Sequence, residues 1–190
     1  PRLHGLENYP SAGPALVVFN HLGDADTALL LATLPAPPDA LGKIELYSFP
    51  ILGKLIDWYG IIWLHRGIPD RRALRAARAG LTDGRIILIA PEGRYTRIGG
   101  LEPGGNGAAF LALQSDVPLV PVALTGTRNA DVYGKMRRLR RAPVTLTVGA
   151  PFRLARQADR QRALREGTEQ IMQRLADLLP AEYRGTYPQS

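Results

Sequence analysis

Cysteine is absent from the 190 residues, which excludes a disulfide scaffold and any thiolate chemistry and fits a reducing compartment. No apolar run approaches the roughly 18 residues that a transmembrane helix needs. The few histidines and the acidic residues form no His-Glu-x-x-His or similar pattern, so we expect no metal. None of the serines lies in a Gly-x-Ser-x-Gly elbow, which removes the main sequence mark of the nucleophile-elbow hydrolases; the serines are Ser11, Ser48, Ser115 and Ser190.

What remains is the composition of an ordinary globular protein, with 45% hydrophobic and 22% charged residues. The length is that of one domain over residues 1–190, with a substantial core. The chain begins at Pro1 rather than at methionine. We therefore expect a trimmed N-terminus, so that an anchor or leader before residue 1 would not be visible in this sequence.

Apolar segments of strand and helix character alternate along the chain. Alternation of this kind predicts an α/β fold with a mostly parallel sheet and helices on both faces. Strands are expected near 15–20, 44–47, 60–65, 85–90, 118–124 and 144–149. Helices are expected near 26–34, 50–58, 70–82, 106–115 and 157–179. The remaining tail, 180–190, is expected to be irregular.

The most informative stretch is residues 20–26, Asn-His-Leu-Gly-Asp-Ala-Asp. It follows the apolar run 15–19, so His21 is predicted at the carboxyl end of a buried strand, where ligands bind in open α/β sheets. Asp26 would lie on the following turn, close enough to hold one imidazole nitrogen. An imidazole held in this way offers its other nitrogen as a proton acceptor. The alternative is a structural role, since a His-x4-Asp spacing alone is common.

A general base without a cysteine or an elbow serine indicates direct attack by a substrate hydroxyl. No covalent acyl-enzyme is then expected. The developing oxyanion needs fixed donors, for which the backbone at Gly23 and Gly93 is the candidate source.

Three further segments follow in order. Residues 60–66 form a short apolar run that ends in Arg66, residues 86–94 deliver Glu92 and Gly93 into a turn, and residues 117–123 are apolar and bracketed by prolines. With Asn-His-x4-Asp, these four blocks resemble those of the glycerolipid and lysophospholipid acyltransferases, the 1-acyl-glycerol-3-phosphate acyltransferase family. The resemblance covers roughly residues 14–124.

The resemblance implies a role for each matching residue. His21 would be the general base and Asp26 its orienting partner. Arg66 would contact the phosphate or glycerol end of the acceptor. Glu92 and Gly93 would shape the acceptor site, because glycine lets backbone approach a substrate closely.

The third block departs from the family pattern. Where the family has Glu-Gly-Thr-Arg, this chain has Glu-Gly-Arg-Tyr, so Tyr95 occupies the usual arginine position. Arg94 or Arg97 would then supply the charge. The turn at 101–107 also lacks the lysine that is common in the family. These departures count against a glycerol 3-phosphate acceptor, but not against acyl transfer.

The net charge of +7 is concentrated in two places. Residues 135–141 hold five cations, and a second group lies on a predicted helix, at Arg71, Arg72, Arg75 and Arg78. Each is either a solvated face or a surface that attracts anionic lipid headgroups or an acidic acyl donor. Nucleic acid fits less well, because aromatic residues are not interleaved and no recognition motif is present.

Residues 49–59 mix apolar side chains with Trp58, Tyr59 and one lysine, which suits either an interfacial membrane helix or packing on the sheet. His65 has no aspartate at a productive spacing and is expected to be polar filling near the site.

Three functions remain open. The first is an acyltransferase that moves a fatty acyl group from acyl-coenzyme A or acyl carrier protein, used as co-substrate without another cofactor, to a lysophospholipid hydroxyl such as that of lysophosphatidic acid. The second is a thioester or ester hydrolase that uses the same His-Asp pair. The third is a non-catalytic lipid-binding relative. In the first case we expect a cytoplasmic protein, peripheral at an anionic membrane surface.

Overall fold

A seven-stranded sheet forms the centre of the computed structural model, which describes residues 1–43, 62–64 and 71–187. The strand order is β1-β7-β6-β2-β5-β3-β4. The strands are β1 (Arg2–His4), β2 (Ala15–Phe19), β3 (Asp39–Lys43), β4 (Ile62–Leu64), β5 (Ile86–Ile89), β6 (Leu119–Thr125) and β7 (Thr145–Val148).

The sheet is mostly parallel, as the alternation of elements predicts. Strands β6, β2, β5, β3 and β4 pair in parallel in that order. At one edge β7 runs antiparallel to β6, and β1 pairs parallel to β7. Strand β2 is central and wholly buried, so the loop that follows it starts at the middle of the sheet's carboxyl edge.

Five α-helices are described, together with the short 3-10 helices η1 (Leu6–Asn8) and η3 (Ala181–Tyr183). The α-helices are α1 (Ala25–Thr33), α3 (Arg71–Thr82), α4 (Gly107–Ser115), α5 (Asn129–Met136) and α6 (Arg160–Leu178). In the part of the chain that these ranges cover, no helix is both long enough and apolar enough to cross a membrane.

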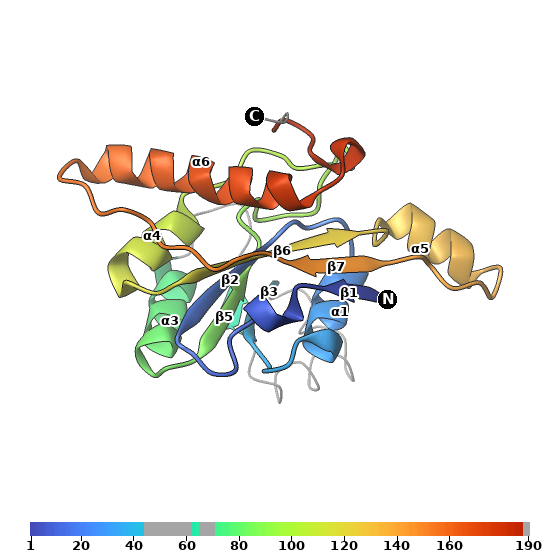
Figure 1. Cartoon of the computed structure of the whole chain (residues 1–190), viewed down its shortest axis with the longest axis horizontal. Helices are drawn as coiled ribbons and strands as arrows, with labels where there is room; N and C mark the ends of the chain where they lie inside the picture. The colour runs from blue at the N-terminus through green and yellow to red at the C-terminus, as the bar shows by residue number, and fades with distance from the viewer. Residues whose placement is uncertain (44–61, 65–70, 188–190) are drawn as a thin grey trace.

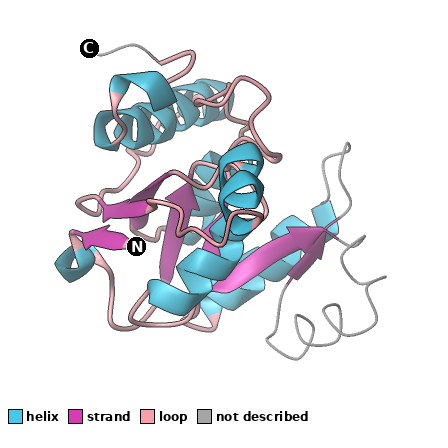
Figure 2. Ribbon diagram, turned by 90° about the vertical axis from the view of Figure 1, so that its right-hand side faces the viewer, coloured by secondary structure: helices cyan, strands magenta, loops and turns pink. Residues whose placement is uncertain are grey.

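Alternation along the strands divides the core into two layers. In β2, Leu16 and Val18 pack with residues of α3, α4 and α6. The intervening Val17 and Phe19 face a second cluster that includes Leu30 of α1. Helices therefore cover both faces of the sheet, with α6 on one side and α1 on the other (Figure 1). The turned view in Figure 2 shows the strands between these helices.

Some elements differ from the sequence-based expectation. Apart from the short η3, the described part of the tail, 180–187, is irregular as expected, but it is packed on the domain: Tyr187 is buried in the core, and the backbone of Leu101 bonds to that of Tyr183 and Thr186. Strand β1 and helix α5 were not predicted. The strand expected near 44–47, the helix near 50–58 and the interfacial segment 49–59 lie outside the described residues, and β3 ends just before them.

Candidate active site

The loop after β2 is anchored to the sheet by Asn20. Its side-chain amide donates to the carbonyl of Leu124 at 3.0 Å, and its carbonyl accepts the Leu124 N–H at 2.7 Å. Asn20 is buried, and both bonds cross to the neighbouring strand β6. This clamp fixes the point at which the chain leaves the sheet, and His21 is the next residue.

The structure brings His21 and Asp26 together. Nδ1 of His21 lies 2.8 Å from Oδ2 of Asp26, which also accepts the N–H groups of Leu22 at 2.6 Å and Gly23 at 2.8 Å. The Asp26 side chain is fully buried, whereas the His21 side chain is 12% exposed. The carboxylate lies in the first turn of α1, where the helix dipole favours negative charge. With Nδ1 held by Asp26, the free nitrogen of the imidazole is Nε2.

Gly23 is required by the tight packing of this turn. A Cβ at this position would lie 2.4 Å from Oδ1 of Asn129 and 2.6 Å from the carbonyl oxygen of Thr127. Asn129 begins helix α5, so the His21 loop is packed directly against the start of that helix.

Glu92 joins the His21 loop to a second loop. It follows β5, which pairs with β2, so both loops leave the same edge of the sheet. Its Oε2 accepts the His21 N–H at 2.9 Å, and its Oε1 accepts the Glu102 N–H at 2.9 Å. A backbone hydrogen bond of 2.8 Å from the Thr96 N–H to the His21 carbonyl also joins the two loops. The Glu92 side chain thus positions His21 through a hydrogen bond to the His21 backbone.

The two glutamates of this loop have opposite electrostatic environments. Burial raises the pKa of Glu92 to about 7, against the lowering effect of its two backbone hydrogen bonds. The pKa of Glu102 is lowered, first by the Arg97 N–H and also by the nearby Arg94 guanidinium. A strongly shifted carboxyl beside a histidine is typical of functional sites, although structural networks also produce such shifts.

Tyr95 lies directly against the imidazole. The two rings meet edge to face with centroids 4.4 Å apart, and the Tyr95 hydroxyl donates to Asp24. Asp24 in turn accepts hydrogen bonds from Asn129 Nδ2 and from the Tyr133 hydroxyl, both at 3.0 Å. The position that carries arginine in the family therefore carries an aromatic ring tied to a carboxylate.

The remaining acceptor residues are placed as follows. Gly93 has a φ of 68°, and no atom of the described residues beyond its chain neighbours lies within 4 Å of a Cβ placed there, which suits close approach of a substrate. The Arg94 guanidinium pairs with the Glu102 carboxylate. Arg97 is exposed, and its N–H bonds to the same carboxylate. Arg66 and His65 lie outside the described residues.

The N–H groups of the two glycines proposed as oxyanion donors are already engaged. The Gly23 N–H bonds to Asp26, and the Gly93 N–H bonds to the Ala90 carbonyl at 3.0 Å. In this arrangement neither is available to a thioester oxygen, which corrects the expectation from the sequence.

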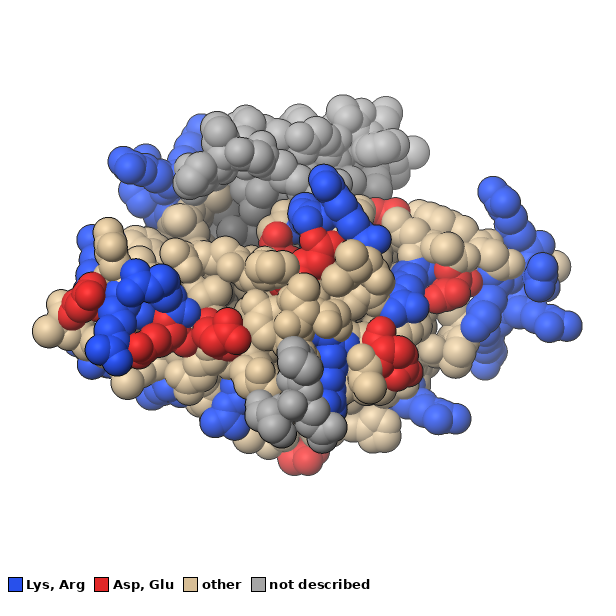
Figure 3. Space-filling view, turned by 90° about the horizontal axis from the view of Figure 1, so that it is seen from above, with Lys and Arg blue, Asp and Glu red and all other residues tan. Residues whose placement is uncertain are grey.

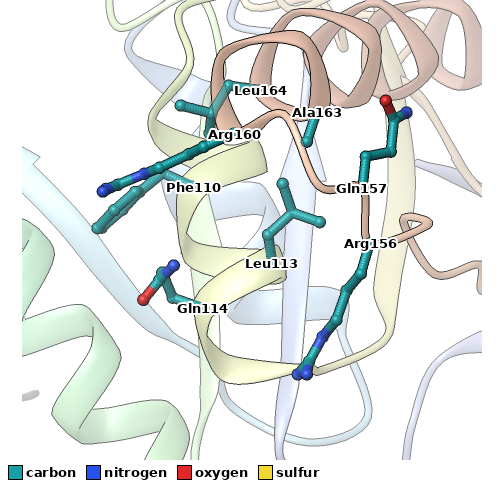
Figure 4. A pocket seen from close by; sticks show the side chains of 8 residues that line it. All are labelled: Phe110, Leu113, Gln114, Arg156, Gln157, Arg160, Ala163 and Leu164. Atoms are coloured by element: carbon teal, nitrogen blue, oxygen red, sulfur yellow. The ribbon is translucent and has the colours of Figure 1, made fainter.

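A cavity of about 370 Å³ lies elsewhere, between α4 and the start of α6 (Figure 4). Phe110 and Leu113 of α4 and Leu164 of α6 contribute to its lining, as do Arg156 and Arg160. None of its lining residues belongs to the loops that carry His21 or Glu92. We therefore do not assign it to the candidate active site.

Sequence reasoning missed the roles of four contributors to the site: Asn20 as a clamp, Asp24 and Tyr95 as a hydrogen-bonded pair, and Glu102 as a backbone partner of Glu92. Asp24 and Tyr95 are 71 positions apart, so no local pattern pairs them. The one indication in the sequence was Tyr95 itself, which stands where the family pattern has arginine and so predicts a different set of contacts at that position.

Comparison with known proteins identifies the family to which this chain belongs. The profile of the Acyltransferase family matches residues 1–125, which include the His21 and Glu92 loops. The chain therefore belongs to the Acyltransferase family, as the four blocks indicate.

Individual relatives carry a more specific name. A 1-acyl-sn-glycerol-3-phosphate acyltransferase from Limnanthes douglasii is 33% identical over 141 residues, 73% of this chain and 50% of that protein. The alpha form from Homo sapiens is 28% identical over 139 residues, 72% of this chain and 48% of the human protein. This chain thus spans about half the length of these relatives.

The fold is also shared with a solved structure. The crystal structure of the 1-acyl-sn-glycerophosphate (LPA) acyltransferase PlsC from Thermotoga maritima superposes with a TM-score of 0.70 at 23% identity. The match covers 93% of this chain and 71% of PlsC. The mostly parallel α/β architecture is therefore confirmed as the architecture of that fold.

Proposed function

We propose that this chain transfers a fatty acyl group from an acyl thioester, acyl-coenzyme A or acyl carrier protein, to a hydroxyl of a lysophospholipid such as lysophosphatidic acid. The observation that supports this most directly is the His21–Asp26 pair at the carboxyl edge of the sheet, with Nδ1 held by a buried carboxylate. The names of the relatives support the acyl-transfer reaction and the acceptor class.

In the proposed mechanism, Nε2 of His21 accepts the proton of the acceptor hydroxyl while the hydroxyl oxygen attacks the thioester carbonyl carbon. A tetrahedral oxyanion forms. Its collapse breaks the carbon–sulfur bond, and the imidazolium returns the proton to the departing thiolate. The products are an ester and a free thiol, and Asp26 stabilises the imidazolium between the two proton transfers.

The positions of the described serines support a mechanism without an acyl-enzyme. Ser11 lies before β2, and Ser115 lies just before β6. These strands are parallel, so both serines are at the sheet's amino edge, whereas His21 follows the carboxyl end of β2. Five strand residues separate the two edges by about 16 Å, far beyond hydrogen-bond reach. Ser48 and Ser190 lie outside the described residues.

The acceptor's charge is the finer part of the proposal. Lysophosphatidic acid fits the relatives' names, but Arg94 is already paired with Glu102, and Tyr95 brings the Asp24 carboxylate to the place of the family arginine. Arg97 is the exposed cation of this loop. A lysophospholipid with a phosphodiester headgroup, which has less charge to neutralise, is therefore the comparison acceptor.

The test identifies the product. Acyl-labelled long-chain acyl-coenzyme A is supplied with lysophosphatidic acid, with lysophosphatidylglycerol or with no acceptor, and acyl carrier protein replaces coenzyme A in a parallel series. Label in the acylated acceptor supports the proposal. Equal release of free fatty acid with and without acceptor would indicate the hydrolase instead, and no turnover with either donor would leave the lipid-binding alternative.

A further inference from the structure

An exposed cationic segment begins in the last turn of helix α5 and continues beyond it. We define the cationic segment as residues 135–141; it holds Lys135 and four arginines, with Met136 and Leu139 between them. Met136 is 62% exposed and Leu139 is 98% exposed. Helix α5 projects from one end of the molecule (Figure 1), and cations gather at that end in the space-filling view (Figure 3).

Exposed apolar side chains are concentrated here. Five large hydrophobic residues are exposed in the described part of the chain, and three of them lie on α5 or in the cationic segment; the five are Leu3, Ile98, Tyr133, Met136 and Leu139. Leu139 also has a φ of 51°, a conformation that a branched aliphatic residue rarely adopts. Both the exposure of this side chain to water and the positive φ of its backbone are unfavourable for leucine.

We propose that the cationic segment docks this chain on the surface of an anionic lipid bilayer. Met136 and Leu139 would enter the interface, and the lysine and arginines would contact the headgroups. An element that combines cations with apolar side chains gains from both electrostatic attraction and apolar burial. This surface goes beyond the proposed reaction, because docking requires no acyl transfer.

The basic group on helix α3 is a solvated face of the same protein and serves as a comparison for the cationic segment. Arg71, Arg72, Arg75 and Arg78 are exposed along α3, but no large hydrophobic residue of α3 is exposed. In α3 the apolar positions Ala73, Ala77 and Leu81 are buried. The two groups therefore have similar charge, but only the cationic segment adds exposed apolar side chains.

Nucleic acid explains the cationic segment less well than a lipid surface. Phosphate contacts use the cations but leave Met136 and Leu139 in water. Base stacking needs accessible aromatic side chains. The aromatic residue of α5 is Tyr133, whose hydroxyl is bonded to Asp24 at 3.0 Å.

The cationic segment is connected to the candidate active site. Asn129 and Tyr133, at the start and middle of α5, both donate to Asp24, three residues after His21. An eight-residue helix is about 12 Å long. Docking through the C-terminal end of α5 would therefore hold the His21 loop about 12 Å from the lipid surface.

Vesicle binding tests the proposal. Vesicles of phosphatidylcholine alone, or of equal parts phosphatidylcholine and phosphatidylglycerol, are sedimented with the protein. Leu139→Asn removes the apolar side chain and installs a residue that tolerates the positive φ, so its fold is retained. We expect about tenfold weaker binding to the anionic vesicles. Arg137→Ser with Arg138→Ser should weaken binding roughly thirtyfold.

The matched control is Arg75→Ser with Arg78→Ser, which removes the same charge from α3 and should change binding little. Wild-type binding to the anionic but not the neutral vesicles supports the proposal. Equal losses in the α3 control, unchanged binding of Leu139→Asn, or displacement from vesicles by RNA with no dependence on Leu139 would overturn it. The readout is independent of turnover, so an inactive protein that docks would refute only the proposed function.

Discussion

Oδ2 of Asp26 lies 2.8 Å from Nδ1 of His21 and accepts two backbone N–H groups of the intervening loop. One buried carboxylate oxygen thus shapes the loop and orients the imidazole. Its other oxygen, Oδ1, is buried without a hydrogen-bond partner in the described structure. The two roles of Asp26 can be separated by substitution.

Asp26→Asn should fold but lose activity. The amide oxygen can replace Oδ2 and keep the Leu22 and Gly23 N–H bonds, at a cost of about 1–3 kcal/mol for the unpaired amide nitrogen. The imidazolium loses its counter-charge, so kcat should fall by about 10²–10⁴. Steady-state kinetics and urea unfolding check both effects. Asp177→Asn, on the exposed face of α6, is the control, and a near-normal kcat for Asp26→Asn would contradict the assigned role.

Glu92→Gln should change the pH dependence of stability. Because burial raises the pKa of Glu92 from 4.5 to about 7, the folded state binds a proton that the unfolded chain has released in this interval. The contribution of Glu92 to the free energy of unfolding is therefore complete below pH 4.5 and is lost as the pH rises to about 7, by at most about 3 kcal/mol.

Glutamine has no titration, so urea unfolding of Glu92→Gln should show a shallower decline across this pH interval. The same variant replaces one carboxylate oxygen by a donor that faces a backbone N–H, which should lower stability by about 1–3 kcal/mol at neutral pH. Glu169→Gln, on the exposed face of α6, is the matched control. Parallel pH profiles for wild type and Glu92→Gln would show that the Glu92 pKa is not raised.

Asn20→Ala should destabilise the protein without a specific effect on substrate binding. The substitution removes the partners of the Leu124 N–H and carbonyl, both buried, and should cost about 2–4 kcal/mol. Urea unfolding measures the loss, and KM of the folded fraction should stay near the wild-type value. A large rise in KM with unchanged stability would mean that Asn20 contacts substrate rather than β6.

Tyr95→Phe and Tyr95→Ala separate the ring from the hydroxyl. Phenylalanine keeps the edge-to-face contact with His21 and loses the hydroxyl that donates to Asp24, so kcat should change less than about threefold. Alanine removes the contact that orients the imidazole, and kcat should fall by about three- to tenfold. An equal loss of kcat in both variants would mean that the hydroxyl matters rather than the ring. An unchanged kcat in both would mean that neither group affects turnover.

The sequence predicts the local part of the site. His21 follows an apolar strand, and Asp26 is in the first turn of the next helix, so strand, turn and helix place them together within six residues. The same local reasoning located Glu92 after β5 but not its partners. Its hydrogen bond from the His21 N–H depends on the pairing of β5 with β2, 71 residues apart, and its bond from the Glu102 N–H depends on the fold of the loop after β5.

Elements without an apolar pattern were missed for a related reason. Strand β1 has three exposed residues and exists because β7 offers it a partner. Helix α5 buries no residue and contains Gly134, so neither periodicity nor helix propensity predicts it. The packing of the tail was not predicted, because it depends on the contact of Tyr187 with the distant core and on backbone bonds to Leu101.

The most direct test of the central claim is acceptor-dependent thiol release by wild type and His21→Ala, measured with a long-chain acyl thioester and a lysophospholipid. His21 is partly exposed, and in the described part of the chain its imidazole forms a hydrogen bond only with Asp26, so the variant should remain folded by circular dichroism. The account predicts a loss of about 10²–10⁴ in kcat. A folded His21→Ala protein with near-normal, acceptor-dependent release would contradict the assignment of His21 as general base.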